Sequence, residues 1–161
     1  MMNMYLKGLD KALNEGCYIK AFCCSMNYPI VRVEKKNNES DALELIAYAE
    51  HNNVLGALNK ASNNIINEDA YTSSSTIICE RTFLDDVIRN GYTLRFYKLN
   101  NDKILSAICT RGKKAIVIES IISNNLESGL KDLNESLQMY YNNTSQFSEH
   151  AKDVLKYKMD K

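Results

Sequence analysis

The sequence predicts an α+β fold made of two tandem α-β-β-β-α units, each an antiparallel three-stranded meander with its helices on one face, followed by a C-terminal amphipathic helix. Two observations lead to this prediction. Helical and strand-like hydrophobic patterns follow one another in the same order twice along the 161 residues. In addition, an Asn-Asn pair precedes the last predicted helix of each unit, at 52–53 and at 124–125, where helix caps are expected.

The predicted boundaries divide the chain into four segments: 1–66 for the first unit, 67–79 for a linker, 80–141 for the second unit and 142–161 for the C-terminal helix. The linker contains the polar run TSSST, which is typical of a connecting segment. A unit of about sixty residues is small for a self-sufficient core, so the two units are expected to pack together.

The first unit begins with a helix over 5–14, where apolar residues recur at helical spacing, and Gly16 follows at the usual position of a helix-ending glycine. Three β-prone segments come next: 17–24, 30–36 and 43–49. The middle one alternates apolar with charged residues, as a strand with one solvated face does. Asn53 is then predicted to cap a helix over 54–65.

The second unit repeats this order. A helix over 82–91 ends at Gly91, and three further β-prone segments follow: 92–99, 103–110 and 115–122. Asn125 is predicted to cap the last helix, whose stripe of leucines begins at Leu126.

The two units overlay in sequence. Without gaps, their first parts match at Leu9 with Leu84, Asp10 with Asp85, Gly16 with Gly91, Ile19 with Leu94, and Lys20 with Arg95. The closing helices match, Val54 with Leu126, once the second unit loses a few residues in its turns. We interpret this agreement at both ends as an internal duplication.

Composition narrows the classes of partner. The chain has 20 Lys and Arg residues and 20 Asp and Glu residues. This balance argues against bulk electrostatic binding to nucleic acid or membrane, but it leaves open binding through local patches of charge. No apolar run approaches a membrane span and the N-terminus is not signal-like, so a cytoplasmic location without a membrane partner is expected. Abundant Asn, Lys, Ile and Tyr suit an AT-rich bacterial or phage genome.

No catalytic or metal motif is recognisable, and we expect neither an enzyme nor a cofactor or metal. The five cysteines lack a C-x-x-C pattern and are expected to be buried and reduced, while His51 and His150 are expected to be structural or surface residues. Asp85 and Asp86 point about 100° apart on a helix, so they suit the helix dipole better than paired acid–base chemistry. The charged turn at Arg111 lacks the glycines of a phosphate-binding loop.

A nucleic-acid-binding module is one alternative. The order of elements resembles that of the double-stranded RNA-binding domain, although neither closing helix begins with that family's lysine cluster. Basic residues instead occur on predicted turns: Lys35, Lys36, Arg111, Lys113 and Lys114. Near Arg95, the aromatic residues Tyr92, Phe96 and Tyr97 suit either a base-stacking platform or one face of the core.

A second resemblance is to small phage-encoded anti-CRISPR proteins of type II systems. The segment TFLDDVIRNGYTLRFY resembles their first helix and strand, and VRVEKKNNESDALELIAYAEHNN resembles their strand–acidic turn–strand–helix passage. In that family, carboxylates and amides of this turn imitate DNA in the binding site of the effector nuclease. The resemblance implies the partner-binding residues Asn38, Glu39, Asp41 and Glu44.

The preferred hypothesis is therefore a non-enzymatic phage or mobile-element protein that occludes a host defence protein, such as a CRISPR effector nuclease, in the bacterial cytoplasm. The alternatives are a nucleic-acid-binding module that uses the basic turns, and a sponge for a nucleotide immune signal that uses Arg95, Tyr97 and Arg111. Each of these hypotheses leaves open whether the chain forms a homodimer.

Overall fold

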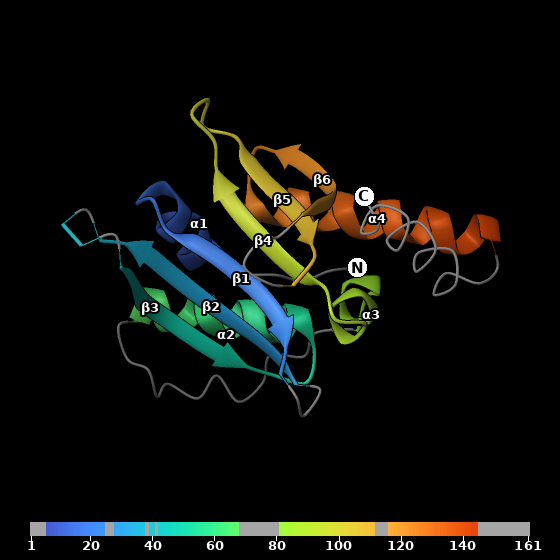
Figure 1. The fold of residues 1–161 in the computed structure, drawn as a ribbon, viewed down its shortest axis with the longest axis horizontal. Coiled ribbons are helices and arrows are strands. Elements are labelled where there is room, and N and C mark those ends of the chain that lie inside the picture. The colour runs from blue at the N-terminus through green and yellow to red at the C-terminus, as the bar shows by residue number, and fades with distance from the viewer. Residues whose placement is uncertain are drawn as a thin grey trace.

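The computed structural model describes residues 6–24, 28–37, 39–40, 42–67, 81–111 and 116–144, with only the backbone of 67 and 139–144. Within them the chain forms one six-stranded antiparallel sheet and four helices, which confirms the predicted α+β class (Figure 1). In chain order the elements are α1 (Lys7–Asn14), β1 (Tyr18–Cys23), β2 (Pro29–Lys36), β3 (Leu43–Glu50), α2 (Val54–Asn67), α3 (Phe83–Arg89), β4 (Thr93–Lys98), β5 (Ile104–Cys109), β6 (Val117–Ser123) and α4 (Leu126–Thr144).

The two meanders join into a single sheet. The strand order is β3-β2-β1-β4-β5-β6, so the first strand of each half pairs with the first strand of the other. In this antiparallel pair Ile19 lies opposite Phe96, Lys20 opposite Arg95, and Ala21 opposite Leu94. Since Lys20 and Arg95 are also equivalent in the sequence overlay, the centre of the sheet has the arrangement of a two-fold axis between β1 and β4.

All four helices pack against one face of the sheet (Figure 1). α2 covers β2 and β3, α4 covers β5 and β6, and the short helices α1 and α3 lie over the central strands. The core cluster lies between these layers and unites both halves, with Leu9, Ile19, Leu58, Phe96 and Leu130 all fully buried. Removing this apolar area from water is the main driving force for joining the halves.

The helix ends follow local sequence signals. Gly16 and Gly91 follow α1 and α3 with φ of +88° and +94°, a left-handed conformation in which a side chain would be strained. The predicted asparagine caps are confirmed. The Asn53 side-chain oxygen accepts a hydrogen bond from the Gly56 N–H at 2.7 Å, and the Asn125 oxygen accepts one from the Ser128 N–H at 2.8 Å.

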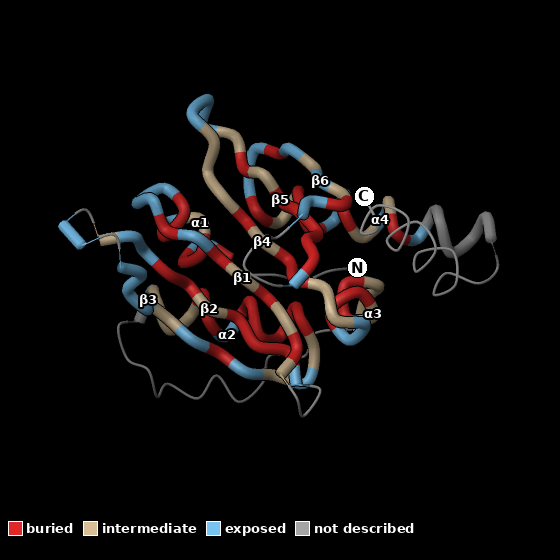
Figure 2. The backbone as a smooth tube through the Cα atoms, in the orientation of Figure 1, coloured by how far each residue is buried: buried red, intermediate tan, exposed pale blue. Residues whose placement is uncertain are grey.

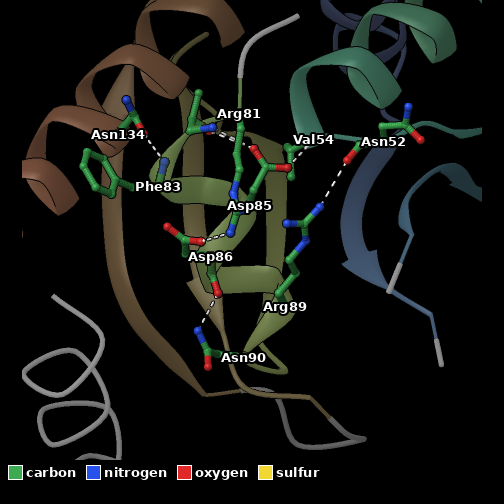
Figure 3. Close-up of polar contacts among 10 residues, drawn as sticks. Asn52, Val54, Arg81, Phe83, Asp85, Asp86, Arg89, Asn90 and Asn134 are labelled. Carbon is green, nitrogen blue, oxygen red and sulfur yellow. Dashed lines mark hydrogen bonds and ion pairs between the residues drawn. The ribbon is translucent and has the colours of Figure 1, made fainter. Parts of the chain in front are cut away.

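Equivalent positions of the two halves also make equivalent contacts. In the first half the Gly8 N–H donates to the Ser62 hydroxyl at 2.9 Å, which ties α1 to α2. At the matching positions of the second half, the Phe83 N–H donates to the Asn134 side-chain oxygen at 3.0 Å (Figure 3). The β2–β3 and β5–β6 pairings each contain one register irregularity, also at matching positions.

Each half also caps a helix of the other half. Asp85 on α3 accepts hydrogen bonds from the Thr82 N–H of its own helix and, at 2.8 Å, from the Val54 N–H at the start of α2 (Figure 3). The matching residue Asp10 on α1 accepts from the Leu126 N–H at the start of α4, at 3.1 Å. A carboxylate at a helix N-terminus satisfies a free donor and suits the helix dipole. The halves are therefore joined by reciprocal caps as well as by the sheet.

Part of the predicted organisation falls outside the described residues. This applies to 68–79 of the predicted linker and to 145–161 of the predicted C-terminal helix, while α4 itself continues to Thr144. No helix in the described part of the chain is long and apolar enough to span a membrane.

Replacing Asp85 by Ala is expected to lower the free energy of unfolding by about 2–4 kcal/mol, because two N–H groups at helix starts lose their acceptor. Asp86→Ala is the matched control, since Asp86 is the neighbouring residue and makes an exposed ion pair with Arg81. That variant should lose no more than about 1 kcal/mol. Urea denaturation measures both values, and equal losses would contradict the capping role of Asp85.

Candidate binding site on the open face of the sheet

The face of the sheet opposite the helices carries polar and aromatic side chains. Successive residues of a strand point to opposite faces, so β1 and β4 each present two different sets. The set facing the helices is buried in the core and comprises Ile19, Ala21, Leu94 and Phe96. The set on the open face is partly exposed and comprises Tyr18, Lys20, Phe22, Arg95 and Tyr97.

Three cations form a row across the middle of this open face. Arg32 on β2 lies directly opposite Lys20 on β1, and Lys20 lies directly opposite Arg95 on β4. Directly opposed residues of an antiparallel pair lie on the same face with their side chains close together, where like charges are destabilising. The fold therefore places positive charges together at some cost in stability.

Only one end of this row is neutralised. Arg32 donates to the buried carboxylate of Glu34 at 3.0 Å. Lys20 and Arg95 have no hydrogen-bond or ion-pair partner in the described part of the structure, and the Nε of Arg95 is buried without an acceptor. An anion placed over Lys20 and Arg95 would offset their mutual repulsion.

A shallow hollow of about 200 Å³ lies beside these two cations. Its lining includes Lys20, Arg95, Leu43, the acidic Glu34 and two tyrosines that face each other across β1 and β4. The rings of Tyr18 and Tyr97 are in edge-to-face contact, with centroids 5.5 Å apart and an interplanar angle of 71°. The hollow thus combines two tyrosine rings with two cations, and its acidic residue Glu34 is paired with Arg32.

The structure gathers only part of the predicted basic set at this site. Arg95 and Tyr97 do lie together, whereas Phe96, considered with them from the sequence, is fully buried in the core. Lys35 and Lys36 lie at one end of the sheet and Arg111 at the other, which follows from the antiparallel register. Lys113 and Lys114 lie outside the described residues.

The predicted acidic turn is described in part. Asn38 and Asp41 lie outside the described residues, while Glu39 and Glu44 are exposed. The side chain of Asn37 organises this turn, because its oxygen accepts from the Glu39 N–H at 2.9 Å and its nitrogen donates to Glu44 at 3.3 Å. Glu44 is therefore held by the turn itself.

Sequence reasoning missed Lys20, Tyr18 and Phe22 as site residues. The overlay of Lys20 with Arg95 was the available signal, because a pair of matching residues lies directly opposite where the two-fold axis passes between the two strands. That signal becomes useful only once the joining of the two meanders through β1 and β4 is known.

The described cysteines are not part of the lining of this hollow. Cys17 and Cys23 are buried, and burial raises the pKa of each thiol. Burial also raises the pKa of the buried Cys109 thiol, with the nearby Arg95 acting in the opposite direction. Within the described residues, no three His, Cys, Asp or Glu side chains are grouped to hold a metal ion. Cys79 and His150 lie outside this part of the chain.

Comparisons of the chain with protein-family models, with curated proteins and with solved structures gave no significant match.

His51 provides a pH test of packing against α2. Its ring lies against Gly56 with a buried, unpartnered Nδ1, and burial, followed by the charge of Lys60, lowers its pKa below the ordinary value of 6.5. The contribution of neutral His51 to the free energy of unfolding should be complete above the unfolded pKa, and be lost as the pH falls through the lower folded pKa. Urea denaturation from pH 7 downwards should show this loss in the native protein and not in His51→Gln.

Proposed function

We propose that this chain is a non-enzymatic binding protein whose open sheet face binds a nucleotide unit, with the base against Tyr18 and Tyr97 and the phosphate over Lys20 and Arg95. The observation that carries the proposal is the unneutralised pair of opposed cations at the centre of the sheet. A fold that tolerates like charges at directly opposite positions gains most from a ligand that is an anion.

The tyrosines narrow the class of anion. A bare phosphate would use the two cations and leave the aromatic side of the hollow unoccupied, whereas a nucleotide offers a ring to Tyr18 and Tyr97 as well. The hollow, at about 200 Å³, is smaller than the roughly 300–1,000 Å³ of pockets that enclose drug-sized ligands. It therefore suits one base or sugar–phosphate unit, with the rest of the ligand in solvent.

The substitution Lys20→Glu separates binding from folding. A carboxylate opposite Arg95 replaces a like-charge pair by an ion pair, so the free energy of unfolding should rise by about 0.2–1 kcal/mol. Binding of adenosine monophosphate should weaken at least about tenfold, because the anion site loses one cation and its other cation gains a partner. Urea denaturation and amide chemical-shift titration measure the two effects.

The matched control is Lys11→Glu, which makes the same charge change at an exposed position of α1, on the helix side. It should leave binding unchanged. In the native protein the ligand should shift amides of β1 and β4 around Lys20 and Arg95, and it should do so more than phosphate alone or adenosine alone. Absence of saturable shifts at these amides would remove the proposal.

The second candidate function is protein binding through the edge strand β3. Four large apolar side chains are exposed along this strand, which pairs with β2 on one side only: Leu43 (53%), Leu45 (51%), Ile46 (46%) and Tyr48 (39%). Figure 2 shows the exposed stretch along β3 beside the buried central strands. An exposed apolar edge strand is a typical docking surface for another polypeptide.

This surface adjoins the turn of Glu39 and Glu44. In the hypothesis that the chain inhibits a bacterial defence protein, it is the surface that would contact that protein. The proposed partner is a type II CRISPR effector nuclease in the cytoplasm of a bacterial host. In this case the apolar strand supplies contact area and the two exposed carboxylates supply the DNA-like charge.

In the inhibitor hypothesis, the purified chain should reduce DNA cleavage by a type II effector nuclease loaded with its guide RNA. Leu45→Lys should weaken that inhibition by about tenfold or more, because it places a charge in the apolar surface. Ile66→Lys on α2 is the matched control, because Ile66 has the same exposed fraction of 51%. Full cleavage of DNA in the presence of the native chain would eliminate the inhibitor hypothesis. Intact inhibition by the Glu39→Lys variant would show that the acidic turn is not part of the inhibitory surface.

We also propose that the two halves arose by internal duplication of one α-β-β-β-α unit. Support comes from contacts that recur at matching positions, namely the two asparagine caps, the two reciprocal aspartate caps and the two glycines with positive φ. Duplication explains why a cation stands on each side of the central strand pair, because one ancestral position supplied both Lys20 and Arg95.

A further inference from the structure

Cations and aromatic rings alternate along the middle of the open face, beyond the central hollow. The register of the strands places Lys36 at one end, the Tyr18–Tyr97 pair next, Lys20 with Arg95 at the centre, Phe22 after them and Arg111 at the other end. Glu34 lies opposite Tyr18 on the same face, where its carboxylate is paired with Arg32. Successive same-face residues of a strand are about 7 Å apart, so each aromatic position lies one such step from the central cations.

The Arg111 end of this track is held in place. The guanidinium of Arg111, which follows β5, donates a hydrogen bond to the carbonyl oxygen of Cys23 at the end of β1. This contact crosses β4 and keeps the positive charge beside Phe22, the preceding residue of β1. Phe22 is half-buried and lies opposite Ile30 of β2.

The two ends of the track are related by the same pseudo-symmetry as the rest of the fold. In the ungapped overlay Phe22 matches Tyr97, and Lys36 matches Arg111. Each half therefore contributes an aromatic ring on one side of the central cations and a cation beyond the other half's ring. The track runs diagonally from β2, across β1 and β4, to the end of β5.

We propose that the ligand of this face is a single-stranded nucleic acid of several nucleotides, laid along the track from Lys36 to Arg111. One base stacks at Tyr18 and Tyr97, a second stacks at Phe22, and Lys20 with Arg95 hold the phosphate between them. This inference rests on the proposed nucleotide-binding function and names its ligand. Sequence-tolerant binding of single strands uses this combination of aromatic platforms and a basic path.

A duplex does not fit this description, because its bases are paired and stacked on each other and cannot lie on the rings of the sheet. The overall electrostatic attraction between the chain and a nucleic acid is also small, since the chain has equal numbers of acidic and basic residues. Affinity must therefore come from local contacts along the track, and it should increase with ligand length until both aromatic positions are occupied.

A length series of fluorescein-labelled oligonucleotides, from one nucleotide to an octanucleotide, tests this inference by fluorescence anisotropy. The octanucleotide should bind at least about tenfold more tightly than the mononucleotide, because it reaches the second ring and Arg111. Phe22→Ala should weaken octanucleotide binding by about 5- to 100-fold and leave mononucleotide binding unchanged. Phe22→Tyr, which keeps an aromatic ring, should retain octanucleotide binding.

Arg111→Gln is the second variant and does not depend on the packing of Phe22. It should make the dependence of log K on log salt shallower by about 0.7 for the octanucleotide, the value for one lost phosphate contact on a single strand. Lys11→Gln on α1 removes an exposed cation from the helix side and should leave this slope unchanged.

The outcomes distinguish this inference from the function on which it rests. If the octanucleotide binds no more tightly than the mononucleotide while Lys20→Glu still weakens the binding of both, the track is wrong and the nucleotide site stands. Equal binding of a duplex and a single strand would also overturn the track. Failure of every ligand to bind would remove the nucleotide site itself.

Discussion

The antiparallel pairing of β1 with β4 is the contact on which the remaining architecture depends. It converts two three-stranded meanders into one sheet and removes two edges that would otherwise have unpaired backbone groups. It also brings each opening helix beside the closing helix of the other half, where Asp10 and Asp85 cap Leu126 and Val54. A unit of about sixty residues buries little apolar surface alone, and the joined sheet gives both units a common core.

The same pairing generates the candidate site. β1 and β4 pair antiparallel in a register that places Lys20 directly opposite Arg95, the residue that matches it in the sequence overlay. On the helix side this register is favourable, because it places Ile19 opposite Phe96 and Ala21 opposite Leu94 within the core. On the open side it opposes two cations for which the described residues supply no ion-pair partner. Local conflicts of this kind are typical of functional positions, where a ligand completes the interactions.

Much of the fold could be predicted from the sequence. The helices and strands lie close to their predicted ranges, and both asparagine caps and both terminal glycines have the predicted roles. The residues of the candidate site were predicted less completely. Arg95 and Tyr97 were predicted as ligand-binding residues, but Tyr18 and Lys20 were not, because their partners are far away in the chain. Asp85, interpreted from the sequence through the dipole of its own helix, also caps α2 of the other half.

The sequence by itself determined the order of the elements and their approximate ends. These features depend on hydrogen bonds and backbone preferences within a few residues, such as a glycine with positive φ or an asparagine oxygen at a helix start. Only the tertiary structure decided which strands join the halves, which face of the sheet stays open and which cations meet on it. Those choices arise from burial of apolar surface between segments distant in the chain, which no local pattern encodes.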